Sequence, residues 1–333
     1  MSRKLISLSA ATILMSSIAM ADVPSVAVDI APVHSLVARV MRTVGAPNLI
    51  IPTNASPHQY NLRPSEAKAL QDANLVFWMG EGLAPWMENA LESLSSNAKI
   101  IALLDQKETE LMEFREGALF EEHDHSDHAD DDDHDDHDEH DDHDEHDDHD
   151  DHDDHDDHDE HAHGKYDPHA WLSLENARTW LNLIAAQLSA TDPENAGVYF
   201  SNAAEARAEL ETLIAEVNTM LKPVRGLKFV VFHDAYQYFE NSFDFPASGA
   251  IALGDATDPS PTRIAQIHGR IKEEGIDCVL AEPQYKPGLV ATVLDGSNAK
   301  ASVIDPLGYG LEPGEKLYPQ LIRQMAKTLV NCL

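Results

Sequence analysis

Histidine is the residue type that dominates the chemistry available to this sequence. The chain holds 19 histidines, and 14 of them lie in one block at residues 121–163 that also holds 26 acidic residues. Neutral imidazole beside carboxylates suits borderline divalent ions such as zinc. We therefore interpret the block as an auxiliary metal-capturing loop, with a solubilising acidic linker as the alternative. Its histidines are His123, His125, His128, His134, His137, His140, His143, His146, His149, His152, His155, His158, His161 and His163.

The block is expected to be a disordered insertion. From His134 to His161 a histidine recurs at every third residue among acids. A three-residue step advances an α-helix by about 300°, so successive histidines turn around the axis instead of forming one face. The block offers no apolar stretch to bury, and its like charges repel one another. Metal bound there would be held weakly and exchanged quickly.

Three of the five remaining histidines share one kind of place. His58 follows a strand expected at 48–51, His233 follows the strand expected at 229–232, and His169 lies where a loop becomes a helix. In open α/β sheets, ligands bind beyond the carboxyl ends of the strands. We expect the three imidazoles to converge as the ligands of one tight metal site.

The sequence indicates the roles of the other histidines and of the polar residues near the three expected ligands less clearly. Asp167 and Asp234 adjoin two of these histidines, and they either orient them as hydrogen-bond partners or cap helices. Glu282 is expected to face the cleft in which the three histidines converge. His34 is expected to have a surface or packing role, and His268 a solvent-facing one.

Charge and the N-terminus narrow the function classes. The net charge of −36, most of it on the block, argues against nucleic acid and against an anionic membrane surface. Residues 1–21 combine two early basic residues, an apolar run of about 16 residues and a small-residue site ending at Ala21. They predict a signal peptide removed near Ala21 and a periplasmic mature protein, with a membrane anchor as the alternative.

The chain has two cysteines, Cys278 and Cys332. In an exported protein, an even pair favours a disulfide. Two buried free thiols are the alternative.

Hydrophobic patterning predicts an α/β fold with two Rossmann-like lobes bridged by a long helix. The three histidines come from both halves of the chain, so we expect the metal in the interlobe cleft. Short apolar runs alternate with helical patterns in both halves, which favours parallel sheets. The domains expected are an N-terminal lobe at 22–190, a bridging helix at 191–223 and a C-terminal lobe at 224–333. The bridge, about 30 residues at 1.5 Å each, would be roughly 45 Å long.

Several segments together carry a family resemblance. SPHQYNLRPSEAKALQDANLVFWMG, DPHAWLSLENA, FVVFHDAYQYFE and LAEPQY followed by VIDPLG resemble the zinc-specific solute-binding proteins of bacterial ABC importers, the ZnuA type of cluster A-I. The resemblance covers nearly the whole mature chain. It implies zinc ligation by His58, His169 and His233, with Asp305 of VIDPLG completing the site. It also implies a disulfide between the two cysteines.

The sequence departs from the family at one position. Some members carry a glutamate just before the first ligand, and here Pro57 stands in that place. Asp305 or a water molecule is then the expected fourth ligand. The manganese receptors of the superfamily carry a carboxylate as third ligand, so His233 favours zinc.

The sequence therefore predicts a periplasmic high-affinity zinc receptor that delivers Zn²⁺ to the membrane permease of an ABC importer. A periplasmic zinc chaperone is a further expected partner, no nucleic acid is, and the protein is expected to be a monomer without catalytic activity. The alternatives are a zinc-dependent hydrolase, a metal-storage protein, and a manganese or iron receptor.

Overall fold

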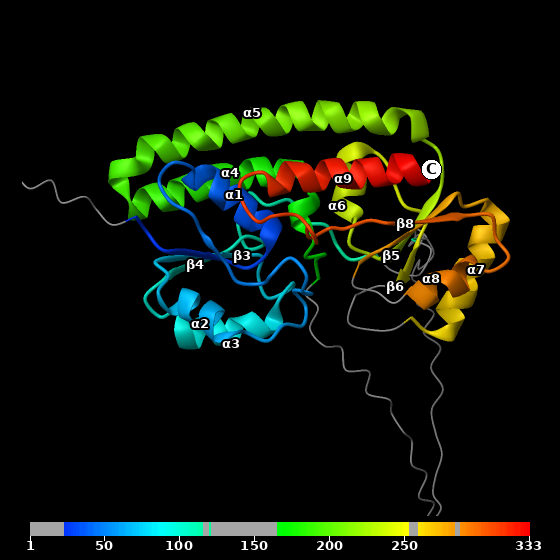
Figure 1. The fold of residues 1–333 in the computed structure, drawn as a ribbon, viewed down its shortest axis with the longest axis horizontal. Helices are drawn as coiled ribbons and strands as arrows, with labels where there is room; N and C mark the ends of the chain where they lie inside the picture. Colours follow the sequence, from blue (N-terminus) through cyan, green and yellow to red (C-terminus); the bar gives the residue numbers. More distant parts are fainter. Residues whose placement is uncertain (1–22, 116–119, 121–164, 253–258, 284–286) are drawn as a thin grey trace, which may run out of the picture.

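The computed structural model describes residues 23–115, 120, 165–252, 259–283 and 287–333. The predicted signal peptide at 1–21 and the predicted disordered loop at 121–163 lie outside the described residues. Within the described residues, the chain forms two parallel sheets that lie side by side below a layer of helices (Figure 1).

The first lobe is built on a sheet whose strand order is β2-β1-β3-β4, with every pair parallel. Helix α1 lies on one side of this sheet, and α2 and α3 lie on the other (Figure 1). Because both faces are covered, the inner strands β1 and β3 are apolar without alternation, and all their residues are buried. The elements are β1 (Val26–Val28), α1 (Ala31–Met41), β2 (Asn48–Leu49), α2 (Pro64–Gln71), β3 (Leu75–Trp78), α3 (Pro85–Leu94) and β4 (Lys99–Ala102).

The second lobe repeats the same order, as β6-β5-β7-β8, again with parallel pairs. In both lobes the first strand in the chain occupies an inner position, so the chain direction across the sheet reverses there. Such a reversal opens a crevice at the carboxyl ends of the strands. The elements are β5 (Phe229–His233), α6 (Gln237–Phe243), β6 (Ala250–Ala252), α7 (Pro261–Glu274), β7 (Cys278–Ala281), α8 (Pro287–Leu294), β8 (Lys300–Val303) and α9 (Leu317–Cys332).

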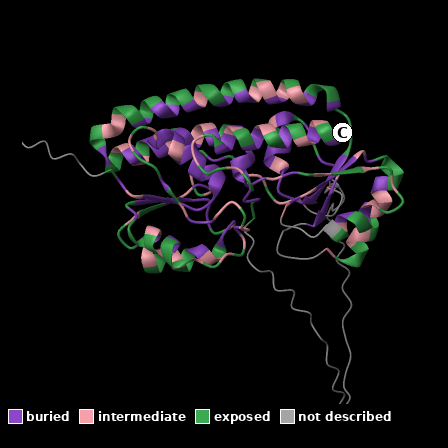
Figure 2. Ribbon diagram, viewed as in Figure 1, coloured by how far each residue is buried: buried purple, intermediate pink, exposed green. Residues whose placement is uncertain are grey.

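A long helix, α5 (Ala196–Leu221), runs above both lobes (Figure 1). It follows α4 (Leu174–Thr191) and the 3₁₀ turn η2 (Pro193–Asn195), and it ends in the turn η3 (Lys222–Val224). Its 26 residues correspond to about 39 Å. One stripe of its surface is buried against α1, α4 and α9, and the opposite face is exposed (Figure 2). The expected bridge is thus a helix that contacts elements of both lobes.

The predicted disulfide is confirmed, because Cys278 at the start of β7 is bonded to Cys332 at the end of α9. The bond ties the last helix to the second sheet. No helix in the described part of the chain combines the length and the apolar character that crossing a membrane requires.

Candidate metal centre

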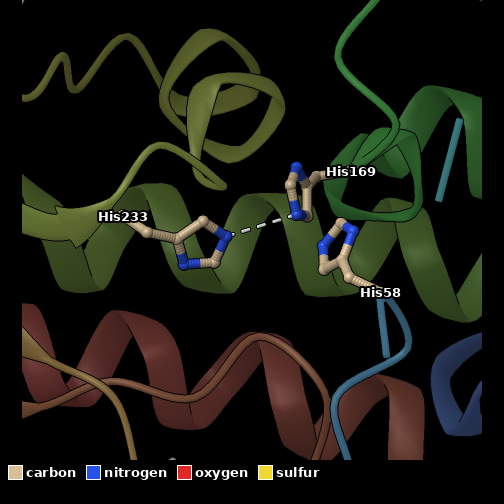
Figure 3. Close-up of side chains that lie close together, drawn as sticks. All are labelled: His58, His169 and His233. Carbon is tan, nitrogen blue, oxygen red and sulfur yellow. Dashed lines mark hydrogen bonds between the residues drawn. The ribbon is translucent and has the colours of Figure 1, made fainter. Parts of the chain in front are cut away.

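Three histidines from three separate segments gather between the two lobes (Figure 3). His233 is the last residue of β5, His169 directly precedes the 3₁₀ turn η1 (Ala170–Leu172), and His58 lies in the loop between β2 and α2. His169 and His233 are buried, and His58 is half-buried. Each offers one ring nitrogen to a group whose atoms all lie within 4.8 Å of one another.

The spacing of the two buried rings fits a single ion. Nε2 of His169 lies 3.4 Å from Nε2 of His233 (Figure 3). Two nitrogens bound to tetrahedral zinc at about 2.0–2.1 Å are about 3.3–3.4 Å apart. The two imidazoles are therefore already placed at the separation that one zinc ion requires.

A carboxylate holds the outer nitrogen of each buried ring. His169 Nδ1 lies 2.7 Å from Asp167 Oδ1, and His233 Nδ1 lies 2.6 Å from Glu282 Oε1. A carboxylate at Nδ1 favours the tautomer that carries the proton there, which leaves the Nε2 lone pair free for a metal. Asp167 Oδ1 also accepts from the backbone N–H of His169 at 2.9 Å, so one carboxylate oxygen contacts both the ring and the backbone of this histidine.

Asp234 was expected to orient a histidine or to cap a helix, but its main contact is of a different kind. Its carboxylate pairs with Arg115, a residue to which the sequence analysis assigned no role. Arg115 stands beside the His/Asp-rich block in the sequence, and no local pattern there distinguishes a buried arginine from one exposed to solvent. His34 and His268 have roles outside the group of three: His34 Nε2 lies 3.1 Å from the carbonyl of Pro47, and His268 Nε2 lies 2.7 Å from that of Asp295.

The loop that carries His58 is fixed by an aromatic residue that the sequence analysis also missed. Trp86 Nε1 donates to the carbonyl of Pro57 at 2.8 Å, and the Trp86 ring lies 5.9 Å from that of Tyr60. The Tyr60 hydroxyl donates to Glu66 at 2.8 Å. Nothing in the sequence around Trp86 indicated this contact, because Pro57 lies 29 residues away in the chain.

Asp305 is not a member of the group formed by the three histidines. It follows β8, and its Oδ1 accepts from the backbone N–H groups of Leu307 and Gly308 at 2.9 and 3.0 Å. The turn needs a glycine at 308, where φ is +88° and an added Cβ would lie 3.2 Å from Leu317. Asp305 Oδ2 is buried and accepts no hydrogen bond from the residues that the structure describes.

The surroundings of the histidines are acidic. Burial raises the pKa of Asp167 to about 6, against the lowering effect of its bond to the His169 backbone. Burial also raises the pKa of Asp305, and the nearby Glu282 raises it further. Buried carboxylates near three imidazoles create a site that favours a divalent cation over a neutral ligand.

A family model described as "ZnuA: Zinc-uptake complex component A periplasmic" matches residues 26–332. The chain belongs to this family. It is 48% identical over 308 residues to the high-affinity zinc uptake system protein ZnuA of Brucella abortus (strain 2308). This alignment covers 92% of this chain and 91% of that relative. It is 47% identical over 316 residues to the protein of the same name from Paracoccus denitrificans (strain Pd 1222), which covers 95% and 93%.

Solved structures of the ZnuA family share the fold. A crystal structure of ZnuA superposes with a TM-score of 0.70 at 21% identity, covering 93% of this chain and 99% of that one. A ZnuA deletion mutant with zinc bound gives a TM-score of 0.69 at 20% identity, covering 93% and 98%. The expected class of two α/β lobes with a long helix is confirmed by these likenesses and by the described elements.

Proposed function

We propose that the protein is a periplasmic high-affinity zinc receptor that binds Zn²⁺ between its lobes and delivers it to the membrane permease of an ABC importer. One observation carries the proposal: three imidazoles from both lobes lie together, with carboxylates on the outer nitrogens of two of them. Imidazole-rich shells suit zinc better than manganese. Membership of the zinc-uptake family and the names of the relatives support the same metal.

Zinc is the cargo of this protein and not a catalyst within it. His58, His169 and His233 each supply one nitrogen. The fourth position is taken by Asp305, whose buried Oδ2 has no hydrogen bond within the described residues, or by a water molecule. Of these two, we propose Asp305, because a bound zinc ion would give its buried Oδ2 the partner that the described residues do not provide. Catalysis needs a base beside an open position, and the carboxylates here contact ring nitrogens instead.

The proposed uptake cycle uses parts of the chain that the structure does not describe. Residues 1–21 direct export to the periplasm and are removed near Ala21. The histidines of residues 121–163 raise the local zinc concentration near the tight site. A periplasmic zinc chaperone is proposed as a donor, and the receptor acts as a monomer.

A measurement of zinc stoichiometry and affinity tests the proposal. The protein chains to compare are the mature protein, a variant lacking residues 121–163, and His58→Ala. We expect one tight site that survives the deletion and is lost or weakened in His58→Ala. Loss of tight binding with the deletion would favour metal storage over reception. Tighter binding of manganese than of zinc at equal free ion would refute the choice of metal.

A further inference from the structure

Arg115 lies six residues before the His/Asp-rich block and reaches the second lobe. Its Nε and Nη2 donate to the carboxylate of Asp234, with Nε–Oδ2 at 3.1 Å. Its Nη1 and Nη2 donate to Glu240, at 2.7 and 3.0 Å. Asp234 directly follows His233, and Glu240 lies on α6. One guanidinium thus joins the first lobe to the segment that presents a zinc ligand.

Both carboxylates depend on this guanidinium. The side chain of Asp234 is 3% exposed and that of Glu240 is 4% exposed. Burial raises the pKa of each, and the contact with Arg115 opposes that rise. Buried charges that lose their partner are strongly unfavourable, so a chain without Arg115 would rearrange here.

A second contact fastens α6 to the same part of the first lobe. The Tyr238 hydroxyl donates to the carbonyl of Asp167 at 2.9 Å and accepts from the backbone N–H of Met112 at 2.9 Å. Asp167 N–H donates to the Met112 carbonyl at 2.8 Å, and Glu113 and Tyr166 form an antiparallel bridge. These two short segments, residues 112–115 and 165–167, we call the paired stem.

The paired stem therefore contacts one buried histidine directly and the neighbour of the other. Asp167 of the stem holds the ring of His169, and Arg115 of the stem holds the residue next to His233. The two rings approach each other from different lobes, and their nitrogens are 3.4 Å apart.

We propose that Arg115 is a positioning residue for zinc binding, which holds His233 at the distance from His169 that one ion requires. The inference rests on the proposed function. Apparent affinity falls in proportion to the fraction of molecules whose ligands are in place before the metal arrives. Loss of the two-carboxylate contact frees the loop after β5 and lowers that fraction.

The positive charge of Arg115 lowers zinc affinity, whereas its positioning role raises it. Substitutions can therefore separate these two effects by whether zinc affinity rises or falls. A cation near the site repels Zn²⁺, and its removal alone would tighten binding. Arg115→Met removes both the positive charge and the hydrogen bonds to Asp234 and Glu240. Arg115→Lys keeps the charge but cannot contact both carboxylates in the same planar geometry. Positioning predicts weaker binding in both variants, whereas charge alone predicts tighter binding in the first and no change in the second.

The experiment uses the full mature chain at a temperature well below its melting point. Zinc affinity is measured by competition with a chromophoric chelator, at free zinc low enough that the wild type binds one equivalent. Co²⁺ absorption reports the geometry of the bound ion. The matched control is Arg39→Met. The Arg39 side chain is 9% exposed against 17% for that of Arg115, pairs through Nε and Nη2 with Glu209, and joins α1 to α5 instead of the stem to α6.

We expect at least a tenfold weaker zinc affinity and a changed Co²⁺ spectrum in Arg115→Met, a smaller loss in Arg115→Lys, and zinc affinity within threefold of wild type in Arg39→Met. Unchanged or tighter binding in Arg115→Met would overturn the proposal. An equal loss in Arg39→Met would overturn it too, since general loosening would then explain both. If Arg115→Met does not fold, Arg115→Lys and Tyr238→Phe decide, with wild-type affinity in both counting against positioning. A wild type without a tight equivalent would instead refute the proposed function.

Discussion

The contact between Glu282 and His233 offers the sharpest prediction about the metal centre. Glu282 Oε1 lies 2.6 Å from Nδ1 of His233, and the two side chains are 0% and 2% exposed. The bond is short, charge-assisted and shielded from water, so it fixes the ring and raises the basicity of Nε2. Glu282→Gln keeps the volume and an oxygen acceptor but removes the negative charge.

The expected loss of zinc affinity in Glu282→Gln can be estimated from other carboxylates that orient metal-binding histidines. Loss of a carboxylate that orients a metal-binding histidine lowers affinity about 10- to 100-fold. This corresponds to about 1.4–2.7 kcal/mol of binding free energy. Glu282→Ala should weaken zinc binding more, because it leaves a cavity and removes the acceptor beside Nδ1 of His233 altogether.

The assay is chelator competition at pH 7.5 under conditions where one equivalent of zinc binds. Asp192→Asn is the control, because Asp192 is a buried carboxylate at the turn before α5 that accepts from Tyr199 at 2.8 Å. The control should lose stability and keep zinc affinity. A change below threefold in Glu282→Gln, or an equal change in Asp192→Asn, would refute the reasoning about ring orientation.

Three further predictions concern the fourth ligand, the disulfide and a buried acid. Asp305→Asn should weaken zinc binding about tenfold or more through loss of a charged ligand, and unchanged affinity by chelator competition would assign the position to water. Replacing Cys278 and Cys332 by serine should cost about 4 kcal/mol in urea unfolding for a sequence separation of 54, and a cost below 1 kcal/mol would contradict this. Burial raises the pKa of Asp29 from 3.8 to about 7, so the folded state holds a proton that the unfolded state releases above about pH 4. The stability from that proton is lost as pH rises through 7, and between pH 7.5 and 5.5 the wild type should gain about 2 kcal/mol relative to Asp29→Asn. Parallel pH profiles of unfolding free energy would contradict that linkage.

The grouping of three histidines was predictable from the sequence because parallel sheets impose a rule on where binding residues occur. His233 directly ends an apolar strand, and His58 follows another, so the crevice at the strand ends was their expected place. Long periodic elements such as α5 and α7 were also predictable, because their buried positions recur with helical spacing.

Elements without a local signal escaped prediction. Helix α6 has the sequence QYFENSF, and its aromatic residues are poor helix formers that take this shape because Tyr238 and Phe239 pack in the core. Strand β6 is only three residues long and is defined by pairing with β5. Helix α8 was missed as well, since its eight residues are mainly apolar and show no periodic pattern.

The long-range partners of the histidines were harder to predict, for a different reason. Asp167 was expected near the ring of His169 because it adjoins it in the sequence, whereas Glu282 was expected only to face the cleft and Arg115 was assigned no role. Arg115 lies 119 residues from Asp234 in the chain, and Glu282 lies 49 from His233. Only the folded arrangement of two lobes brings such residues together, and no spacing rule in one sequence encodes it. The sequence therefore predicted the group of three histidines more fully than the long-range contacts that hold them in place.

The central claim is that one zinc ion is held by His58, His169 and His233 outside the His/Asp-rich block. Crystals of the zinc-loaded protein, measured on both sides of the zinc absorption edge, test it most directly. The account predicts one strong anomalous peak at about 2.0–2.1 Å from a ring nitrogen of each of the three histidines. A peak that lacks any one of these histidines, or zinc held tightly only by residues 121–163, would contradict it.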